Sequence, residues 1–288
     1  MKVKKLAHRV FNIVAWLCII FVTLVGLIFL YSRYVAPYDF SVVNTNIENP
    51  LIAESANGIK IMQFSDTHLG AYYSLKEFEK VVNAINKAKP DIVIFSGDLI
   101  DSLHDYKEST DDLTTLLSSI NAPYGKFCVF GNHDYGGGAE RVYPKLMKAS
   151  GFTLLKNENY VIESLKLNFI GIDDVLIGYG DVKAAGKAIP GYYNIVIAHE
   201  PDIADDVAKY PVNLMLSSHT HGRQINISLL DNFILPPYGK RYIEGLYVFA
   251  NAEKMRLYVT RGIGTTQIPI RFNSKPELSE FTLLKSLN

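Results

Sequence analysis

Residues 91–101 read Asp-Ile-Val-Ile-Phe-Ser-Gly-Asp-Leu-Ile-Asp, an apolar run that leads into a glycine and two acids. A short, continuously apolar run is typical of a parallel strand that is buried on both faces. Before it, residues 58–65 form another strand-like run, and residues 75–85 carry apolar side chains at helical spacing, with Pro90 just past their end. Strand, helix and strand in this order predict a parallel βαβ unit and an α/β fold.

The rest of the chain extends this alternation and then becomes richer in strands. A single domain with a sheet-on-sheet core accounts for the pattern, because no internal repeat and no second linker divides it. We therefore predict a layered β-sandwich flanked by helices. The further expected elements are helices at 108–120, near 139–149 and at 203–209, strands at 126–130, 193–198 and 212–217, a hairpin pair at 159–172, and continued β pattern at 224–234 and 245–261.

The N-terminal part carries an uncharged run of 23 residues, 10–32, rich in Ile, Leu, Val and Phe. As a helix this run extends about 34 Å, enough to cross a hydrocarbon core of about 30 Å. The alternative is a cleaved signal peptide, whose apolar region has roughly 7–15 residues and ends at small residues. The run is longer than that, and its nearest small-residue site, at Ala36, is followed by Pro37. We expect a retained single-pass membrane helix.

The basic residues around this run predict its orientation. Lys2, Lys4, Lys5 and Arg9 precede it, whereas only Arg33 follows it closely. The positive-inside rule then places the N-terminus in the cytoplasm and the bulk of the chain outside, in an extracellular or periplasmic position. The expected divisions are a cytoplasmic basic segment 1–9, a transmembrane helix 10–32, a linker 33–57 and a folded domain 58–288.

Composition excludes several classes of protein. The chain has 288 residues, of which 48% are hydrophobic and 20% charged, so it is neither disordered nor collagen-like. Two cysteines exclude a disulfide framework and a cysteine-built metal site. Five of the 29 basic residues lie in residues 1–33, which leaves 24 against 29 acids for the rest. A domain with that balance is not expected to bind nucleic acid.

Five polar clusters each follow a strand-like run, where the carboxyl ends of strands bind ligands in α/β sheets. In an extended segment residues i and i+2 point the same way, so Asp66 and His68 can converge on one ion, and so can His219 and His221. Taken singly, each cluster also fits a turn or a structural histidine; together they indicate one site. The clusters are Asp66-Thr-His68, Gly97-Asp98-Leu-Ile-Asp101, Gly131-Asn-His-Asp134, His199-Glu-Pro201 and His219-Thr-His221.

In this order the motifs D-x-H, G-D-x-x-D, G-N-H-D, H and H-x-H resemble those of the calcineurin-like metallophosphoesterases. The tail at 261–272, followed by Pro276-Glu277, resembles the end of a bacterial subfamily with N-terminal membrane segments or export signals. The resemblance covers nearly all of residues 58–288. It implies a metallophosphoesterase domain with the calcineurin-like fold and two divalent metal ions.

The resemblance also implies the ligands. Carboxylate, imidazole and amide groups suit Mn²⁺, Fe or Zn²⁺. Two such ions about 3.5–4 Å apart share a water and lower its pKa, and the resulting metal-activated hydroxide attacks phosphorus in line. By the resemblance, one ion is held by Asp66, His68 and His221, the other by Asn132, His199 and His219, and Asp98 bridges them.

Four residues are expected to act on the substrate or beside it. By the resemblance, His133 serves the leaving-group oxygen, and Asp101 pairs with His133; the alternative for Asp101 is a helix cap. Asn132 and His133 are also expected to contact the substrate. Arg223 replaces a glycine of the family's G-H-T-H-G-G-Q block, and either binds a second phosphate or points into solvent.

These observations predict a membrane-anchored phosphoesterase that hydrolyses phosphate ester or pyrophosphate bonds, phosphodiesters included, on small-molecule, lipid-linked or cell-envelope substrates. The family resemblance also admits one alternative, a hydrolase of the pyrophosphate bond in a UDP-lipid sugar of the lipid A type. Members acting there work from the cytoplasmic side, which the predicted orientation disfavours. The other alternative is an inactive tethered binding module. No obligate protein partner is expected.

Overall fold

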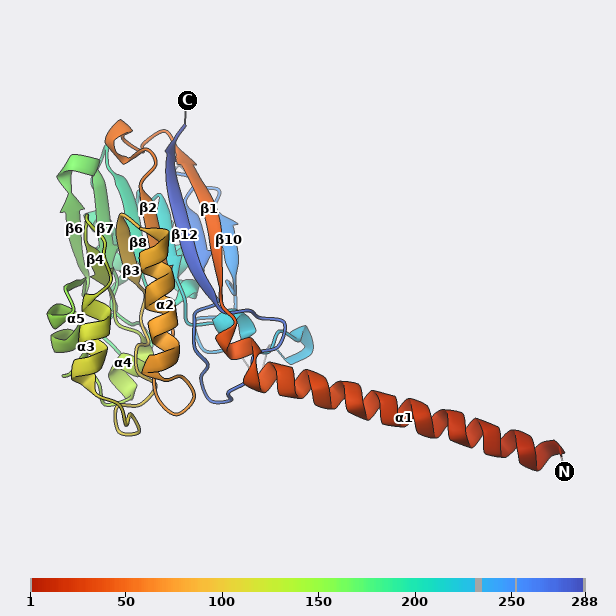
Figure 1. Cartoon of the computed structure of the whole chain (residues 1–288). Helices are drawn as coiled ribbons and strands as arrows, with labels where there is room; N and C mark the ends of the chain where they lie inside the picture. The colour runs from red at the N-terminus through yellow and green to blue at the C-terminus, as the bar shows by residue number, and fades with distance from the viewer. Residues whose placement is uncertain (1, 231–234, 252, 287–288) are drawn as a thin grey trace.

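Two six-stranded sheets lie face to face, as Figure 1 shows for the computed structural model, which describes residues 2–230, 235–251 and 253–286. The predicted layered α/β sandwich is confirmed. The first sheet has the order β1 (Ser41–Asn49), β12 (Glu277–Lys285), β2 (Lys60–Phe64), β3 (Ile92–Phe95), β4 (Lys126–Cys128), β5 (Phe152–Leu154). The second has the order β10 (Gly245–Val248), β11 (Arg256–Val259), β9 (Leu214–Ser217), β8 (Tyr193–Ile197), β7 (Leu167–Gly171), β6 (Glu158–Ile162).

Helices cover the outer faces of both sheets. α2 begins where the Ser74 side chain accepts from the backbone of Glu77, whose side chain in turn accepts from the Ser74 N–H. Such a capping box satisfies two otherwise unpaired N–H groups and fixes the start of a helix. The helices against the first sheet are α2 (Leu75–Ala88), α3 (Thr110–Ser118), α4 (Asn132–Gly136) and α5 (Tyr143–Ala149), and α6 (Ala204–Val207) lies against the second.

The core follows from the alternation of side chains along the buried strands. In β3, Ile92 and Ile94 point between the sheets, and Val93 and Phe95 point toward the helices. All four are fully buried, which explains why this strand reads as an unbroken apolar run.

The parallel strands bring the site together. β2, β3 and β4 pair in parallel, as do β8 and β9 in the other sheet. The two sheets join at the carboxyl ends of these strands, where the Ser218 hydroxyl donates to the Ser96 carbonyl at 2.9 Å. Every polar cluster singled out in the sequence follows one of these strands, so all of them meet at this edge.

The N-terminal run forms α1 (Lys2–Tyr34), which projects away from the sheets (Figure 1). Its apolar side chains are exposed along the helix. Within the described part of the chain, α1 is the one helix long and apolar enough to cross a membrane, judged by length and composition.

Three sequence expectations differ from the structure. The segment 33–57, expected as a linker, holds β1, which pairs in parallel with β12. Of the β pattern expected at 224–234, residues 224–230 show only an isolated bridge between Ile225 and Phe272 and no strand, and residues 228–230 are 3₁₀; residues 231–234 lie outside the described residues. β12 was not expected, because its polar side chains are interspersed with apolar ones without the run that marks β3.

Candidate metal centre

Five residues of the polar clusters have left-handed backbone: Asp66 (φ 49°), His68 (42°), Asp98 (61°), His219 (73°) and His221 (52°). Residues other than glycine seldom adopt this conformation, because its backbone strain costs on the order of 1–3 kcal/mol. Residues strained in this way are concentrated at functional sites. The clusters around Asp66, Asp98 and His219 therefore lie in tight turns after the strands and not in extended segments. Alternation of side chains along a strand does not apply to them.

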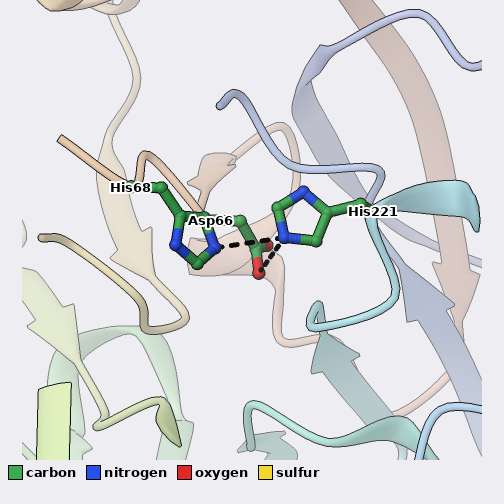
Figure 2. Close-up of side chains that lie close together, drawn as sticks. All are labelled: Asp66, His68 and His221. Atoms are coloured by element: carbon green, nitrogen blue, oxygen red, sulfur yellow. Dashed lines mark hydrogen bonds and ion pairs between the residues drawn. The ribbon is translucent and has the colours of Figure 1, made fainter. Parts of the chain in front are cut away.

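Asp66, His68 and His221 form the first group of potential ligands. Nε2 of His68 lies 3.1 Å from Nε2 of His221, and Oδ1 of Asp66 lies 3.7 Å from the same nitrogen (Figure 2). Asp66 and His68 follow β2 in the first sheet, whereas His221 follows β9 in the second. One atom from each residue lies within 4.8 Å of the others, so the three can hold one divalent ion.

Asp98, His199 and His219 form the second group, with the same spacing of ligand atoms. Oδ2 of Asp98 lies 3.2 Å from Nε2 of His199 and 3.5 Å from Nε2 of His68. Asp98 thus lies between the two groups. Side-chain alternation allowed His219 and His221 to share one ion, but the two lie in different groups, which is the division that the resemblance implied.

Several buried polar atoms at this edge have no hydrogen-bond partner among the described residues, and they include Oδ1 of Asn132 and Nε2 of His199. The nitrogen of His199 approaches Asp98 but without hydrogen-bond geometry. A buried polar atom without a partner costs about 1–3 kcal/mol, and a metal ion removes that cost. The atoms of Asn132 and His199 belong to two of the residues expected to hold the second ion.

In His199 and His219, the ring nitrogen that faces away from the group of ligands has a hydrogen-bond partner. Nδ1 of His199 lies 2.7 Å from the carbonyl of Ser96, and Nε2 of His219 lies 2.9 Å from the carbonyl of Pro237. Each outward nitrogen donates its hydrogen, which leaves the inward nitrogen with a lone pair. Metal-bound histidines have this arrangement, which His68 shares through the contact of its Nδ1 with Asp101, so these three histidines fit divalent ions.

Burial and charge act together on the acids and histidines. Burial raises the pKa of Asp66, and the charge of Asp98 adds to the rise. Burial opposes ionisation of Asp98, but the neighbouring histidines, led by His199, hold its pKa well below the usual value. Burial and the proximity of His199 lower the pKa of His219 to about 4. A cation between the two carboxylates reduces their repulsion and leaves His219 a neutral ligand.

His133 lies beside this centre at the start of α4. Its backbone N–H donates to Oδ1 of Asp98 at 2.8 Å, and its Nδ1 lies 2.8 Å from the Asp101 carbonyl and 3.3 Å from Oδ1 of Asp101. Burial lowers the pKa of His133, but the charges of Asp98 and Asp101 outweigh it and raise the pKa overall. The Asp101 carboxylate also lies 3.0 Å from Nδ1 of His68, a contact that the sequence did not indicate.

A pocket of about 410 Å³ opens over both groups. Arg223 belongs to its wall, with 18% of its side chain exposed and Nη1 3.8 Å from Oε1 of Glu244. The guanidinium is therefore at the pocket and next to an acid, not extended into solvent. The pocket is lined by His68, Asp98, Asn132, His133, Leu176, His219, Thr220, His221, Arg223, Gln224, Ile225, Leu235, Pro236, Pro237, Thr266, Gln267 and Ile268.

Asp134 is a site residue to which the sequence assigned no role, although it ends the Gly-Asn-His-Asp motif. Its buried carboxylate accepts from the backbone N–H groups of Asp98 at 2.8 Å, Leu99 at 3.0 Å and Gly131 at 2.9 Å. It thereby ties the turn after β3 to the turn after β4. Burial and the nearby charge of Asp98 raise its pKa to about 7.

Arg271 is a second residue that the sequence did not single out. It is fully buried, and its guanidinium donates to the carbonyls of Gly264 at 2.6 Å, Arg261 at 2.9 Å and His221 at 3.3 Å. Arg271 therefore holds the turn that carries His221 against the C-terminal tail. It lies within the tail motif, but no local pattern shows that this arginine is buried.

Comparison with known proteins gives one family and several relatives. The sequence model described as calcineurin-like phosphoesterase matches residues 59–223. An uncharacterised metallophosphoesterase of Bacillus subtilis, YkuE, is 40% identical over 90% of this chain and 90% of its own length. The phosphodiesterase YaeI of Escherichia coli is 28% identical over 88% and 92%. The UDP-2,3-diacylglucosamine pyrophosphatase LpxG of Chlamydia muridarum is 27% identical over 77% and 82%.

Proposed function

The chain belongs to the calcineurin-like phosphoesterase family and is a hydrolase, and from this premise we propose that it is a membrane-anchored phosphoesterase with two divalent metal ions. Its preferred bonds are phosphate esters or pyrophosphates of lipid-linked or cell-envelope substrates. Asp66, His68 and His221 hold one ion, Asn132, His199 and His219 hold the other, and Asp98 contacts both.

The proposal of two metal ions rests on the position of the Asp98 carboxylate. Its Oδ2 atom lies within 3.5 Å of a histidine nitrogen from each group, His68 on one side and His199 on the other. A carboxylate in that place suits two neighbouring cations better than one. The unpartnered Oδ1 of Asn132 supplies a further donor to the second ion.

When bound, the two ions supply an acidified water as nucleophile and positive charge beside the phosphoryl oxygens. The residues of the chain bind and orient the substrate. Nδ1 of His133 is turned toward Asp101, so Nε2 is the atom left to face the pocket and give a proton to the leaving oxygen. Asp101 keeps the ring in that orientation.

The anchor and its orientation belong to the same proposal. α1 crosses the membrane once, and the basic residues before it keep the N-terminus in the cytoplasm. The catalytic domain then lies on the extracellular or periplasmic side. Tethering there raises its effective concentration toward phosphates of the membrane and envelope.

A matched pair of histidine variants tests the proposed reaction. The purified full chain is analysed for bound metal and assayed with an aryl phosphate monoester and an aryl phosphodiester in added Mn²⁺. His133→Ala should keep near two ions per chain and lose turnover. His104→Ala, which alters an exposed histidine that does not line the pocket, should keep both. Full activity in His133→Ala would refute the assigned role, and metal binding with no turnover in the unaltered chain would leave a tethered binding module.

A pyrophosphate bond is the second candidate substrate bond, because Arg223 at the pocket wall can bind a second phosphate. The similarity to a relative named as a pyrophosphatase also favours a pyrophosphate bond. Comparing kcat/KM for a nucleoside diphosphate ester with that for a monoester separates the two bonds.

A further inference from the structure

The end of α1 gives the level of the bilayer surface. From Val10, a hydrocarbon core of about 30 Å takes about 20 helical residues and ends near Leu30. Beyond it, the guanidinium of Arg33 lies 4.8 Å from the ring of Tyr34 and 5.8 Å from that of Tyr72. Arginine and tyrosine are typical of the membrane–water interface. Tyr72 follows β2, so this interface runs beside the end of the sheets that carries the metal centre.

Residues 264–273, here called the helix-bound loop, are joined to this end of α1. The backbone N–H of Arg271 donates to the carbonyl of Ser32 at 2.9 Å, and Ser32 is buried. A groove of about 480 Å³ lies between the helix and the loop, with Leu27 on one side and Phe272 on the other. Leu27 lies inside the calculated hydrocarbon span, so the loop reaches the level of the lipid chains. The blue segment against the end of α1 in Figure 1 is this loop.

The helix-bound loop is also a wall of the metal pocket. Its residues Thr266, Gln267 and Ile268 line that pocket. Gln224, which follows the His221 turn, donates from Nε2 to the Ile268 carbonyl at 2.6 Å and accepts from the Thr266 N–H at 2.9 Å. One short loop therefore touches both the membrane helix and the space over the proposed ions.

Exposed apolar side chains continue this surface. Ile268 is 51% exposed, and Leu229 is 90% exposed on the neighbouring segment. That segment is fixed to the loop, because the backbone N–H of Asn226 donates to the carbonyl of Phe272 at 2.8 Å. Apolar side chains left open to water beside a membrane helix are typical of a surface that enters the interface.

We propose that the helix-bound loop, with Ile227 and Leu229, lies in the bilayer surface, so that the metal pocket takes its phosphate group from a lipid of the adjacent leaflet. The groove beside Leu27 accommodates an acyl chain. Hydrolysis adds one water across the P–O bond: phosphorus gains the hydroxyl oxygen, and the leaving oxygen takes a proton. The choice of substrate rests on the proposed phosphoesterase function; contact of the loop with the bilayer does not.

The depth of spin labels in the bilayer tests the contact between the helix-bound loop and the membrane, and this test needs no assay of activity. The full chain, with Cys18→Ser and the buried Cys128 kept, carries a nitroxide at Leu229→Cys or Ile268→Cys in nanodiscs of phosphatidylcholine and phosphatidylglycerol. Both labels should be more accessible to oxygen than to a water-soluble nickel chelate. Tyr160→Cys, an exposed position on the opposite edge at β6, should show the reverse (Figure 1). A water-like pattern at 229 and 268 would overturn the proposal.

Two probes with the same reacting group test access to the pocket. Aryl hexadecyl phosphate in the nanodisc is compared with aryl methyl phosphate in water. The double variant Ile227→Glu, Leu229→Glu should lower the ratio of the two kcat/KM values at least tenfold, whereas Tyr160→Glu should leave the ratio unchanged. An unchanged ratio in the double variant would overturn lipid access. If the unaltered chain hydrolyses neither probe, the proposed phosphoesterase function is refuted. The spin-label result then decides the membrane contact by itself.

Discussion

Oδ1 of Asp101 lies 3.0 Å from Nδ1 of His68, a proposed metal ligand. The same oxygen lies 3.3 Å from Nδ1 of His133, the proposed proton donor. The sequence associated Asp101 with His133 alone. One carboxylate therefore orients both a ligand and an acid, and its replacement should affect metal binding as well as turnover.

Asp101→Asn should weaken the binding of the ion at His68 by about 10–100-fold, since the amide keeps the shape but not the charge that fixes the imidazole. Turnover at saturating Mn²⁺ should also fall, because His133 loses the charge that favours its protonated form. Calorimetric titration of the metal-free chain with Mn²⁺ measures the first effect, and kcat at saturating metal measures the second.

Asp105→Asn is the matched control, as Asp105 is exposed and four residues away. It should leave both quantities unchanged. Wild-type metal affinity in Asp101→Asn would mean that Asp101 acts on His133 alone.

Local signals predicted much of this fold. β3 is buried on both faces by helices and the other sheet, and this produces its uninterrupted apolar run. α2 was predicted from the apolar spacing of residues 75–85 and from Pro90 just past their end. The proposed site residues could be grouped from the sequence because each cluster directly follows a strand, and parallel strands end at one edge.

Other features depend on contacts between distant segments. β12 exists as a strand because β1 and β2 flank it, and nothing within residues 277–285 requires it. The left-handed turns at His219 and His221 are imposed by the surrounding structure against the preference of each residue, so side-chain alternation did not predict their division between two groups, which only the family resemblance implied. Arg271 is buried because carbonyl groups of His221 and of the segment 261–264, far apart in the sequence, surround it.

Gly131→Ala should displace Asp98. A methyl group at this position would lie 2.3 Å from Oδ1 of Asp98 and 2.7 Å from its backbone nitrogen, far inside van der Waals contact. Gly131 has φ −110°, so the conflict is steric and not one of backbone conformation. Metal analysis of the purified chain should find fewer than two ions. Gly136→Ala, whose methyl would meet only the mobile end of Ile177 at 3.3 Å, should retain both; equal metal content would contradict the proposed role of Asp98.

Arg271→Ala should destabilise the chain. Several buried carbonyls would lose a charged donor, at about 1–3 kcal/mol for each group left without a partner. A loss of about 3 kcal/mol corresponds to a fall in Tm of roughly 6–12 °C for a chain of this size. Thermal unfolding of the full chain in detergent, monitored by circular dichroism, measures this fall in Tm. Arg141→Ala, at an exposed position, should shift Tm by little, and an equal shift in the two variants would show that the carbonyl contacts of Arg271 contribute nothing.

Arg223→Ala should discriminate between substrate bonds. The guanidinium lies at the pocket wall, with Nη1 3.8 Å from Oε1 of Glu244. A charge-assisted bond to a second phosphate contributes about 1.5–3 kcal/mol, which corresponds to a rise in KM of roughly 10–100-fold when it is lost. The rise should appear with a nucleoside diphosphate ester and not with an aryl monoester, which has no second phosphate to bind. Arg241→Ala, an exposed arginine paired with Asp205 outside the pocket, should change neither KM. Equal KM changes for both substrates in Arg223→Ala would instead assign Arg223 to the reacting phosphate, because a contact made by every substrate cannot select among them.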